Sequence, residues 1–361
     1  MTLQSVAGLI QGLHHITLVT SNQEANRRFY TEVLGLRRVK LSVNQDDVFH
    51  RHLFYADERG TTGSAITFFE WPDLPPGSVG LGSPHHLSYR VGRVDSLPDW
   101  VSWLRAAGAR VVGPLPRDGR VSIYLRDPDG AVIELTAAHE GTMTEGDVAE
   151  LGRRASSAPV PPSISSAMRL TAFDHASPIA SDPKLSARFF EKLVGLKSAF
   201  SIPDPDQRDA SILAIGSDAR PDFLRYLSSP SAARGGLVGR GSIHHIAMAV
   251  EDDRDQLRIM RRLDDVGIEN SGVVDRSWFR SLYFRDPDGN LLEVATKGPG
   301  YTYDEPLETL GSRLALPRWL EPRRAEIEAV LKKTDDENPA AWPPARYPAT
   351  QERPEALASA A

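Results

Sequence analysis

The sequence predicts an α+β fold in which one strand–helix–sheet unit occurs four times. The best-marked copy covers residues 242–296 and begins with a short apolar strand at 243–250. A helix follows over 255–266, with apolar residues at helical spacing. The unit ends in a hairpin whose turn is Asp-Pro-Asp-Gly at 286–289. In that register position 286 faces 290, so we expect Tyr283 to lie opposite Glu293.

Equal spacings show that the unit is repeated. His86 precedes Glu134 by 48 positions, and His245 precedes Glu293 by the same number. Arg-Asp-Pro-Asp-Gly occurs in both of these units, at 126–130 and 285–289. The other two units begin near residues 13 and 173 and share a helix ending in Gly-Leu. The chain is therefore a duplicated pair of units.

Taken in order, the chain divides into four parts. Residues 12–140 form a first module of units 1 and 2, with helices expected at 23–33 and 100–107 and a strand at 67–69. A Ser/Pro-rich linker occupies 141–168, and units 3 and 4 form a second module at 169–300. In the C-terminal extension, 301–361, we expect a short docked helix after Pro322 and a Pro-rich surface tail at 335–361.

Composition limits the class of protein. A chain of 361 residues can bury a full core, and a net charge of −6 without a basic run argues against a nucleic-acid partner. The absence of cysteine excludes disulfides, thiolate metal sites and a cysteine nucleophile. Residues 1–11 lack the features of a secretory or membrane segment. We therefore expect a cytoplasmic protein without a membrane partner.

Paired histidines point to a metal site. His245 and Glu293 lie in one unit, while His15 and His175 are the equivalents of His245 in units 1 and 3. Two imidazoles and a carboxylate suit divalent first-row metals and leave open positions on one side of the ion. A single histidine pair is better explained as a buried core feature. Three such pairs at equivalent places, with a carboxylate at fixed spacing, favour metal binding.

These motifs resemble the vicinal oxygen chelate superfamily of glyoxalases, bleomycin-resistance proteins and extradiol dioxygenases. Within it the chain is similar to the ring-cleaving dioxygenases that open hydroquinones. The resemblance rests on Gly-Leu-His-His-Ile-Thr at 12–17, Gly-Ser-Ile-His-His-Ile-Ala at 241–247, Trp-Phe-Arg-Ser-Leu-Tyr-Phe-Arg at 278–285 and the trailer at 298–305. It implies four βαβββ units forming two modules of cupped mixed sheets flanked by helices.

The resemblance also implies a metal centre. His15, His245 and Glu293 would hold Fe(II), with Mn(II), Zn(II) or Ni(II) as alternatives. This requires unit 1 to pair with unit 4 and unit 2 with unit 3. The substrates would be a small aromatic diol, of hydroquinone or catechol type, and O2. A homo-oligomeric assembly is left open.

The surrounding polar residues implied by the resemblance are Tyr283, His14, His244, Arg276 and Thr17. Tyr283 would donate a hydrogen bond or a proton to a phenolate oxygen. Either His14 or His244 would shuttle the substrate proton. Arg276 would balance negative charge or form an ordinary salt bridge. An aromatic pocket could be walled by Phe68, Phe69, Trp278 and Phe279.

Three alternatives stay open. His86, Glu134 and His175 would form a second two-histidine, one-carboxylate set beside Tyr124, although the subfamily motifs favour a single active site in units 1 and 4. Addition of Glu70 to the first set would give the four-ligand site of glyoxalase-type isomerases, which use Zn(II) or Ni(II). A non-catalytic binder of the bleomycin-resistance type would lack the metal altogether.

Overall fold

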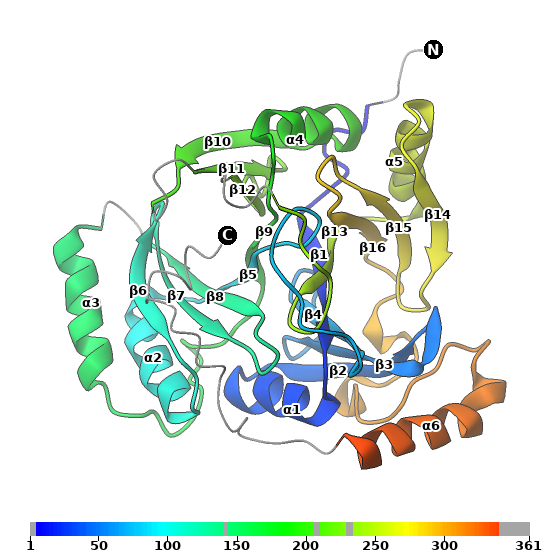
Figure 1. Ribbon diagram of the computed structural model, residues 1–361, viewed down its shortest axis with the longest axis horizontal. Coiled ribbons are helices and arrows are strands. Elements are labelled where there is room, and N and C mark those ends of the chain that lie inside the picture. The colour runs from blue at the N-terminus through cyan, green and yellow to red at the C-terminus, as the bar shows by residue number, and fades with distance from the viewer. Residues whose placement is uncertain (1–4, 140–142, 206–209, 229–233, 339–361) are drawn as a thin grey trace.

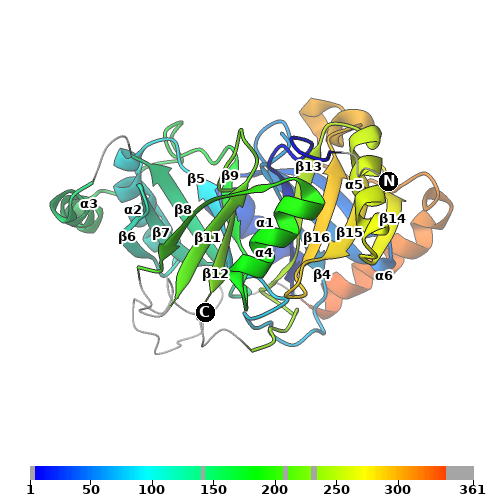
Figure 2. The ribbon, with the colours of Figure 1, turned by 90° about the horizontal axis from the view of Figure 1, so that it is seen from above.

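The strands form two curled eight-stranded sheets that lie side by side (Figures 1 and 2). The computed structural model describes residues 5–139, 143–205, 210–228 and 234–338. Residues 339–361, most of the expected surface tail, lie outside the described residues. No helix in the described ranges is long and apolar enough to cross a membrane.

Each sheet joins two units that are distant in sequence. The first sheet has the strand order β14 (Asn270–Asp275), β15 (Arg280–Arg285), β16 (Leu291–Thr296), β13 (Ile243–Val250), β1 (Leu13–Thr20), β4 (Ala65–Glu70), β3 (Asp47–Ala56) and β2 (Arg37–Asn44). The second has β10 (Lys197–Pro203), β11 (Ser211–Gly216), β12 (Leu224–Ser228), β9 (Phe173–Ser177), β5 (His86–Arg90), β8 (Val132–Ala138), β7 (Arg120–Arg126) and β6 (Val112–Arg117). The predicted pairing of unit 1 with unit 4 and unit 2 with unit 3 is confirmed, as is the α+β class.

The centre of the first sheet is an antiparallel contact between β1 and β13, in which Thr17 lies opposite His245. Outward from this seam, β1 pairs in parallel with β4 and β13 pairs in parallel with β16. Strands covered on both faces carry near-continuous apolar sequence. All eight residues of β1 are accordingly buried, so the histidines on this strand lie deep in the molecule.

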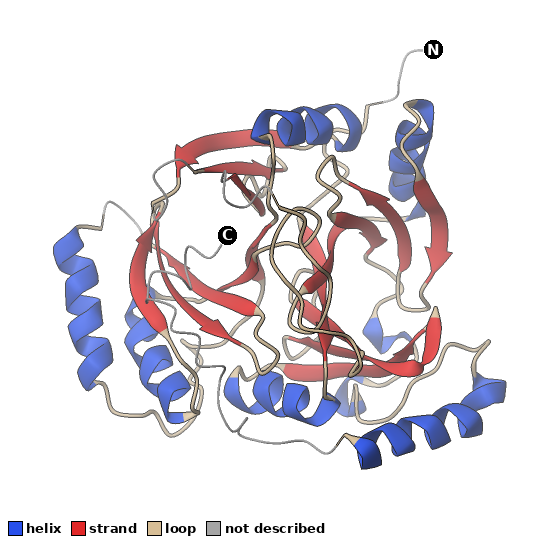
Figure 3. Cartoon of the chain, in the orientation of Figure 1, coloured by secondary structure: helices blue, strands red, loops and turns tan. Residues whose placement is uncertain are grey.

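Helices surround the sheets (Figure 3). They are α1 (Gln23–Arg28), α2 (Leu97–Ala106), α3 (Glu145–Ser157), α4 (Pro183–Phe189), α5 (Asp253–Asp265) and α6 (Arg324–Glu337). A π-helical turn, η1 (Phe29–Val33), continues α1, and η3 (Phe190–Val194) continues α4. Short 3-10 turns occupy η2 (Val94–Ser96), η5 (Tyr301–Tyr303), η6 (Leu307–Thr309) and η7 (Glu321–Arg323).

Two helices lie in segments that the sequence predicts as connections or extensions. The expected linker contains α3, which begins with a capping box at Thr144 and buries Val148, Leu151 and Ala155. This narrow apolar stripe is hidden in a polar, serine-rich sequence. The extension carries α6, with Pro322 in the preceding turn, and α6 lies along β3 (Figure 1).

The hairpin between β15 and β16 has the predicted register. Asp286 N donates to Asn290 O over 3.1 Å, and Gly289 has φ +87°, a left-handed conformation that favours glycine. Tyr283 therefore faces Glu293, as expected from the turn. The turn places the strand that carries the carboxylate in a fixed register with the strand that carries the tyrosine.

The matching turn in unit 2 contains a buried acid. Asp127 accepts hydrogen bonds from the hydroxyl of Tyr30 at 3.1 Å and from the backbone N–H of Asp129 and Ala131. Burial, and next the nearby charge of Asp129, raises the pKa of Asp127 to about 7. The turn is thereby joined to η1 of unit 1, across the boundary between the two sheets.

We expect the native protein to lose stability relative to Asp127→Asn as the pH rises, because the asparagine does not ionise. The folded pKa of Asp127 lies above its ordinary value of 3.8, so the stabilisation is complete below about pH 4 and is lost as the pH rises through 7. Between pH 5 and pH 8 this loss amounts to about 2–3 kcal/mol. Melting temperatures of the variant and the native protein across this range measure the change.

Asp218→Asn serves as the control for this series, because the Asp218 side chain is 80% exposed. Its melting temperature should follow that of the native protein at every pH. A constant difference between Asp127→Asn and the native protein from pH 5 to pH 8 would contradict the assignment of a neutral buried acid.

Candidate metal centre

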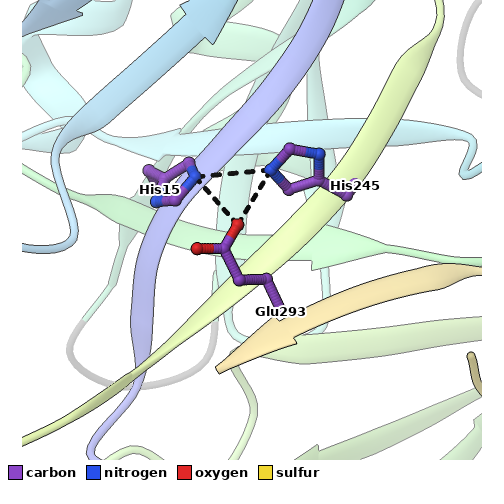
Figure 4. A group of neighbouring side chains, drawn as sticks. All are labelled: His15, His245 and Glu293. Atoms are coloured by element: carbon purple, nitrogen blue, oxygen red, sulfur yellow. Dashed lines mark hydrogen bonds and ion pairs between the residues drawn. The ribbon is translucent and has the colours of Figure 1, made fainter. Parts of the chain in front are cut away.

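Three side chains from three adjacent strands converge on one point in the first sheet (Figure 4). Glu293 Oε2 lies 3.3 Å from His15 Nε2 and 3.0 Å from His245 Nε2, and the two nitrogens are 3.4 Å apart. All three residues are buried. Ligand atoms about 2.1 Å from a metal and at right angles would be separated by about 3.0 Å. The spacing therefore fits one face of an octahedral site.

Hydrogen bonds fix the orientation of His15. His14 Nε2 lies 3.1 Å from Thr296 O, and since a carbonyl can only accept, Nε2 carries the proton. Burial, and next His15, lowers the pKa of His14 to about 3, so the ring is neutral and its Nδ1 accepts. The partner of that nitrogen is His15 Nδ1 at 2.8 Å, which must donate. In the neutral His15 ring, Nε2 therefore presents a lone pair to the centre.

The carboxylate of Glu293 is held by one oxygen and leaves the other to the centre. Ser281 Oγ donates to Oε1 over 2.6 Å. Oε2 is buried and makes no well-oriented hydrogen bond among the described residues, although two imidazole nitrogens lie beside it. Burial raises the pKa of Glu293, but the adjacent His15 and His245 together hold it well below its ordinary value. An ionised carboxylate oxygen beside two imidazole nitrogens is a donor set that a divalent cation satisfies when it displaces any proton from those nitrogens.

A small pocket opens beside these ligands. Its lining includes both histidines and the aromatic rings of Phe54, Phe69, Trp278, Phe279 and Tyr283, together with Asn44, Gln45, His52 and Arg276. The Tyr283 hydroxyl accepts from Arg276 Nε at 3.3 Å, and Asp46 pairs with the same guanidinium at 2.8 Å. The pocket is thus aromatic in its walls and polar around the metal ligands.

The polar residues expected around the centre fall into two groups. Tyr283 and Arg276 line the pocket. His14 and His244 instead lie behind the ligand histidines, each 2.8 Å from the Nδ1 of its neighbour. Thr17 Oγ1 is 2.9 Å from His245 Nε2 and hydrogen bonds with Thr67. His14 and His244 therefore contact the candidate ligand histidines and are absent from the pocket lining.

The prediction that Phe68 forms part of the pocket wall is wrong, and several residues that line the pocket were not predicted from the sequence. Phe68 packs in the core against Tyr30, since alternation along β4 turns Phe68 away from the face that carries Phe69. His52 faces the pocket from β3 and hydrogen bonds with Thr67 at 2.9 Å. His52 is a polar residue in the otherwise apolar run at 52–55, but this run does not show that its side chain faces the pocket.

Comparison with known proteins identifies the family of this chain. The family model for the Glyoxalase/Bleomycin resistance protein/Dioxygenase superfamily matches residues 12–135 and 172–294. The chain belongs to this superfamily. One relative, MhqA of Bacillus subtilis, named "putative ring-cleaving dioxygenase", is 35% identical over 323 residues, with 90% of this chain and 98% of MhqA covered.

Two further proteins extend the comparison. A chlorohydroquinone/hydroquinone 1,2-dioxygenase of Sphingobium indicum is 26% identical, with 88% of this chain and 95% of that protein covered. The crystal structure of a Bacillus subtilis protein named "putative dioxygenase" superposes with a TM-score of 0.74 at 30% identity, covering 90% of this chain and 97% of that one. The similarity therefore extends over both sheets.

The four-ligand alternative with Glu70 is wrong. In unit 1 the position equivalent to Glu293 is Thr67, because Thr17 pairs with Thr67 as Ala247 pairs with Glu293. Glu70 lies three residues further along β4 and so turns to the other face. There it pairs with Arg51 at 2.8 Å and accepts from Gln23 N. The glyoxalase-type set of two histidines and two glutamates is not assembled.

The second sheet brings together the other residues that the sequence singles out. His86, Glu134 and His175 form a cluster like that of His15, His245 and Glu293, with ligand atoms within 4.8 Å of one another. Tyr124 donates to Glu134 Oε1 at 3.0 Å. Both predicted sets are therefore present as compact, buried groups.

We expect Glu293→Gln to weaken binding of a divalent metal at the first centre by at least about tenfold, because a neutral amide replaces the anionic ligand. Glu70→Gln is the matched control: it removes a buried carboxylate and the Arg51 pair from the same sheet but leaves the three ligands intact. Titration of metal-free protein with Co(II), followed by its visible absorption, compares the two. Equal loss of affinity in both variants would contradict the ligand assignment.

Proposed function

We propose that this protein is a metal-dependent, ring-cleaving dioxygenase that opens a small aromatic diol, of hydroquinone or catechol type, with O2. The proposed metal is Fe(II), held by His15, His245 and Glu293, with Mn(II) as the alternative that suits the same ligands. The observation that carries the proposal is a three-ligand cluster beside an aromatic-walled pocket. The names of the relatives from Bacillus subtilis and Sphingobium indicum support the reaction class.

The number of protein ligands suits this reaction. One anionic and two neutral ligands leave room for a substrate oxygen and for O2, and a redox-active metal bound there supplies the electron transfer between them. In the overall reaction one ring C–C bond breaks and both atoms of O2 enter the product. Since Thr67 stands where a fourth ligand would be, no carboxylate of the described residues occupies that position.

The pocket walls suit a flat ring. Phe54, Phe69, Trp278 and Phe279 contribute apolar surface, and three of these side chains are less than 5% exposed. Aromatic side chains favour offset or edge contacts with another ring and exclude water. The walls would therefore hold the substrate in one plane and keep bulk solvent away from the ligands.

Tyr283 is the proposed proton donor. Burial, and next the charge of Glu293, raises the pKa of Tyr283 above its ordinary value, which keeps the hydroxyl protonated. Arg276 donates to this hydroxyl and is itself held by Asp46 and, through its carbonyl oxygen, by Gln45. With its oxygen accepting from Arg276, the Tyr283 O–H is free to donate to an oxygen of the bound diol.

His14, His244 and Thr17 act as positioning residues in this proposal. His14 holds His15 through the Nδ1 contact and is anchored to a backbone carbonyl. His244 makes the corresponding contact with His245 Nδ1. Thr17 Oγ1 lies 2.9 Å from His245 Nε2, the nitrogen that faces the metal position, and so limits the position of that ring from the side of the centre. Such contacts orient ligand rings and commonly change metal affinity by about 10–100-fold when lost.

We expect turnover of a hydroquinone or catechol panel to consume O2 and to stop under anaerobic conditions. An oxygen electrode with parallel product analysis measures this, and a metal chelator should abolish it. An isomerase of the same superfamily would continue without O2, so turnover of a diol under nitrogen would refute the proposal.

Tyr283→Phe should lower kcat/KM by about 10²–10⁴-fold, because one positioned proton donor is lost. Metal content should be unchanged, since the hydroxyl is not a ligand. Tyr303→Phe is the control: Tyr303 is 56% exposed and lies outside the pocket lining. An unchanged kcat/KM in Tyr283→Phe would remove this tyrosine from the mechanism.

A further inference from the structure

The geometry points to a second divalent-metal site in the other sheet, formed by His86, Glu134 and His175 and suited to small organic anions rather than to aromatic diols. Glu134 Oε2 lies 3.3 Å from His86 Nε2 and 3.1 Å from His175 Nε2. The three residues are between 2% and 6% exposed. These separations match those of the first centre.

Strand register shows that the similarity extends to the backbone. Ser88 pairs with both Glu134 and His175, as Ala247 pairs with both Glu293 and His15. His86 lies opposite Ser177, as His245 lies opposite Thr17. The three side chains of the second set therefore occupy strand positions equivalent to those of the first set, and the backbone directs them to one point in the same way.

The supporting contacts are also duplicated. Tyr124 donates to Glu134 Oε1 at 3.0 Å and accepts from Arg117 Nε at 2.9 Å. Tyr283 and Arg276 form the same tyrosine–arginine pair, with the same separation of seven positions in the sequence. Asp174 takes the place of His14 and accepts from His175 Nδ1 at 2.9 Å. In the neutral ring, His175 Nε2 therefore presents its lone pair to Glu134.

One buried carboxylate oxygen of the second site has no well-oriented hydrogen-bond donor among the described residues. Glu134 Oε2 makes no hydrogen bond among the described residues, although the two imidazole nitrogens face it. The charge of Asp174 is already balanced by Arg90 and Arg120, both at 3.1 Å, so it does not compete for a cation at the centre. An anionic oxygen and a nitrogen lone pair that converge in this way fit a divalent metal.

The walls of this second site differ from those of the first. By strand register, Phe54 and Phe69 correspond to Ala214 and Leu227. The offset of 159 positions between Tyr124 and Tyr283 places Gly119 and Arg120 at the positions of Trp278 and Phe279. Among the described lining residues Tyr124 carries the one benzene ring. A flat aromatic substrate therefore loses the stacking surface that the first pocket provides.

Cationic groups replace those rings. Thr67 corresponds to Arg225, which is 4% exposed and lines the second pocket together with Arg117. Arg225 pairs with Asp222 at 2.8 Å, and Asp204 also lines the pocket. The guanidinium groups of Arg117 and Arg225 line the space beside the metal position, so the added ligand should be a small carboxylate, which can chelate a metal through oxygen and accept from a guanidinium.

Metal stoichiometry tests the site independently of any activity. Metal-free native protein, Glu134→Gln and Glu293→Gln are loaded with excess Co(II), desalted and analysed for bound metal per chain. We expect about two Co(II) in the native protein and about one in each variant. Circular dichroism checks that both variants are folded.

One Co(II) in the native protein, unchanged in Glu134→Gln, would overturn the second site. If Glu134→Gln fails to fold, one Co(II) in the native protein that is retained in folded Glu293→Gln would support the second site, and one that is lost there would overturn it. Two bound Co(II) in the native protein, together with no ring cleavage by the Fe(II)-loaded protein, would count against the proposed function alone, so the two proposals fail separately.

The ligand class is tested on the singly loaded variants with oxalate and 4-nitrocatechol as probes. In Glu293→Gln, where Co(II) occupies the second site, oxalate should shift the visible Co(II) absorption and 4-nitrocatechol should not. In Glu134→Gln the catechol should shift the spectrum. A response to 4-nitrocatechol but not to oxalate in Glu293→Gln would overturn the assignment of an anion site.

Discussion

The antiparallel contact of β1 with β13 is the constraint on which the first centre depends. It places Thr17 opposite His245 and thereby brings His15 next to a histidine 230 positions away. Side chains alternate along a strand, so a slip of one residue would turn one histidine to the opposite face of the sheet. The parallel β13–β16 pairing then fixes Glu293 in the same way. Backbone pairing therefore sets the geometry of the ligands before any metal binds.

The charge of the buried carboxylate in this centre must also be compensated. Burial of a carboxylate beside two imidazoles is costly unless a positive charge compensates it. The surrounding hydrogen bonds leave ligand atoms directed toward the centre. Ser281 donates to one oxygen of Glu293 and leaves the other oxygen facing inward. The carbonyl of Thr296 orients His14, which in turn orients His15. The C-terminal trailer strengthens the pocket wall, since Asp304 binds both the buried Lys40 at 2.7 Å and the indole of Trp278 at 3.0 Å.

Features with a fixed sequence interval could be predicted, and features set by packing could not. The spacing of 48 positions and the Asp-Pro-Asp-Gly turn give Tyr283 opposite Glu293, because hairpin register follows from the turn. Glu70 was misplaced because the loop in unit 1 has a different length, which hides the true equivalent, Thr67. His52 faces the pocket from β3 through its pairing with Phe69, which no local pattern specifies.

The arrangement separates metal binding from the choice of ligand. In each sheet the carboxylate and one histidine come from an even-numbered unit, while β3 and β4, or β11 and β12, supply one wall of the pocket. Leu227 and Arg225 of the second sheet occupy the positions of Phe69 and Thr67 in the first. These differences change the wall without moving a ligand, because the wall strands are held by their own backbone hydrogen bonds. The same seam can therefore support an aromatic pocket in one sheet and a cationic pocket in the other.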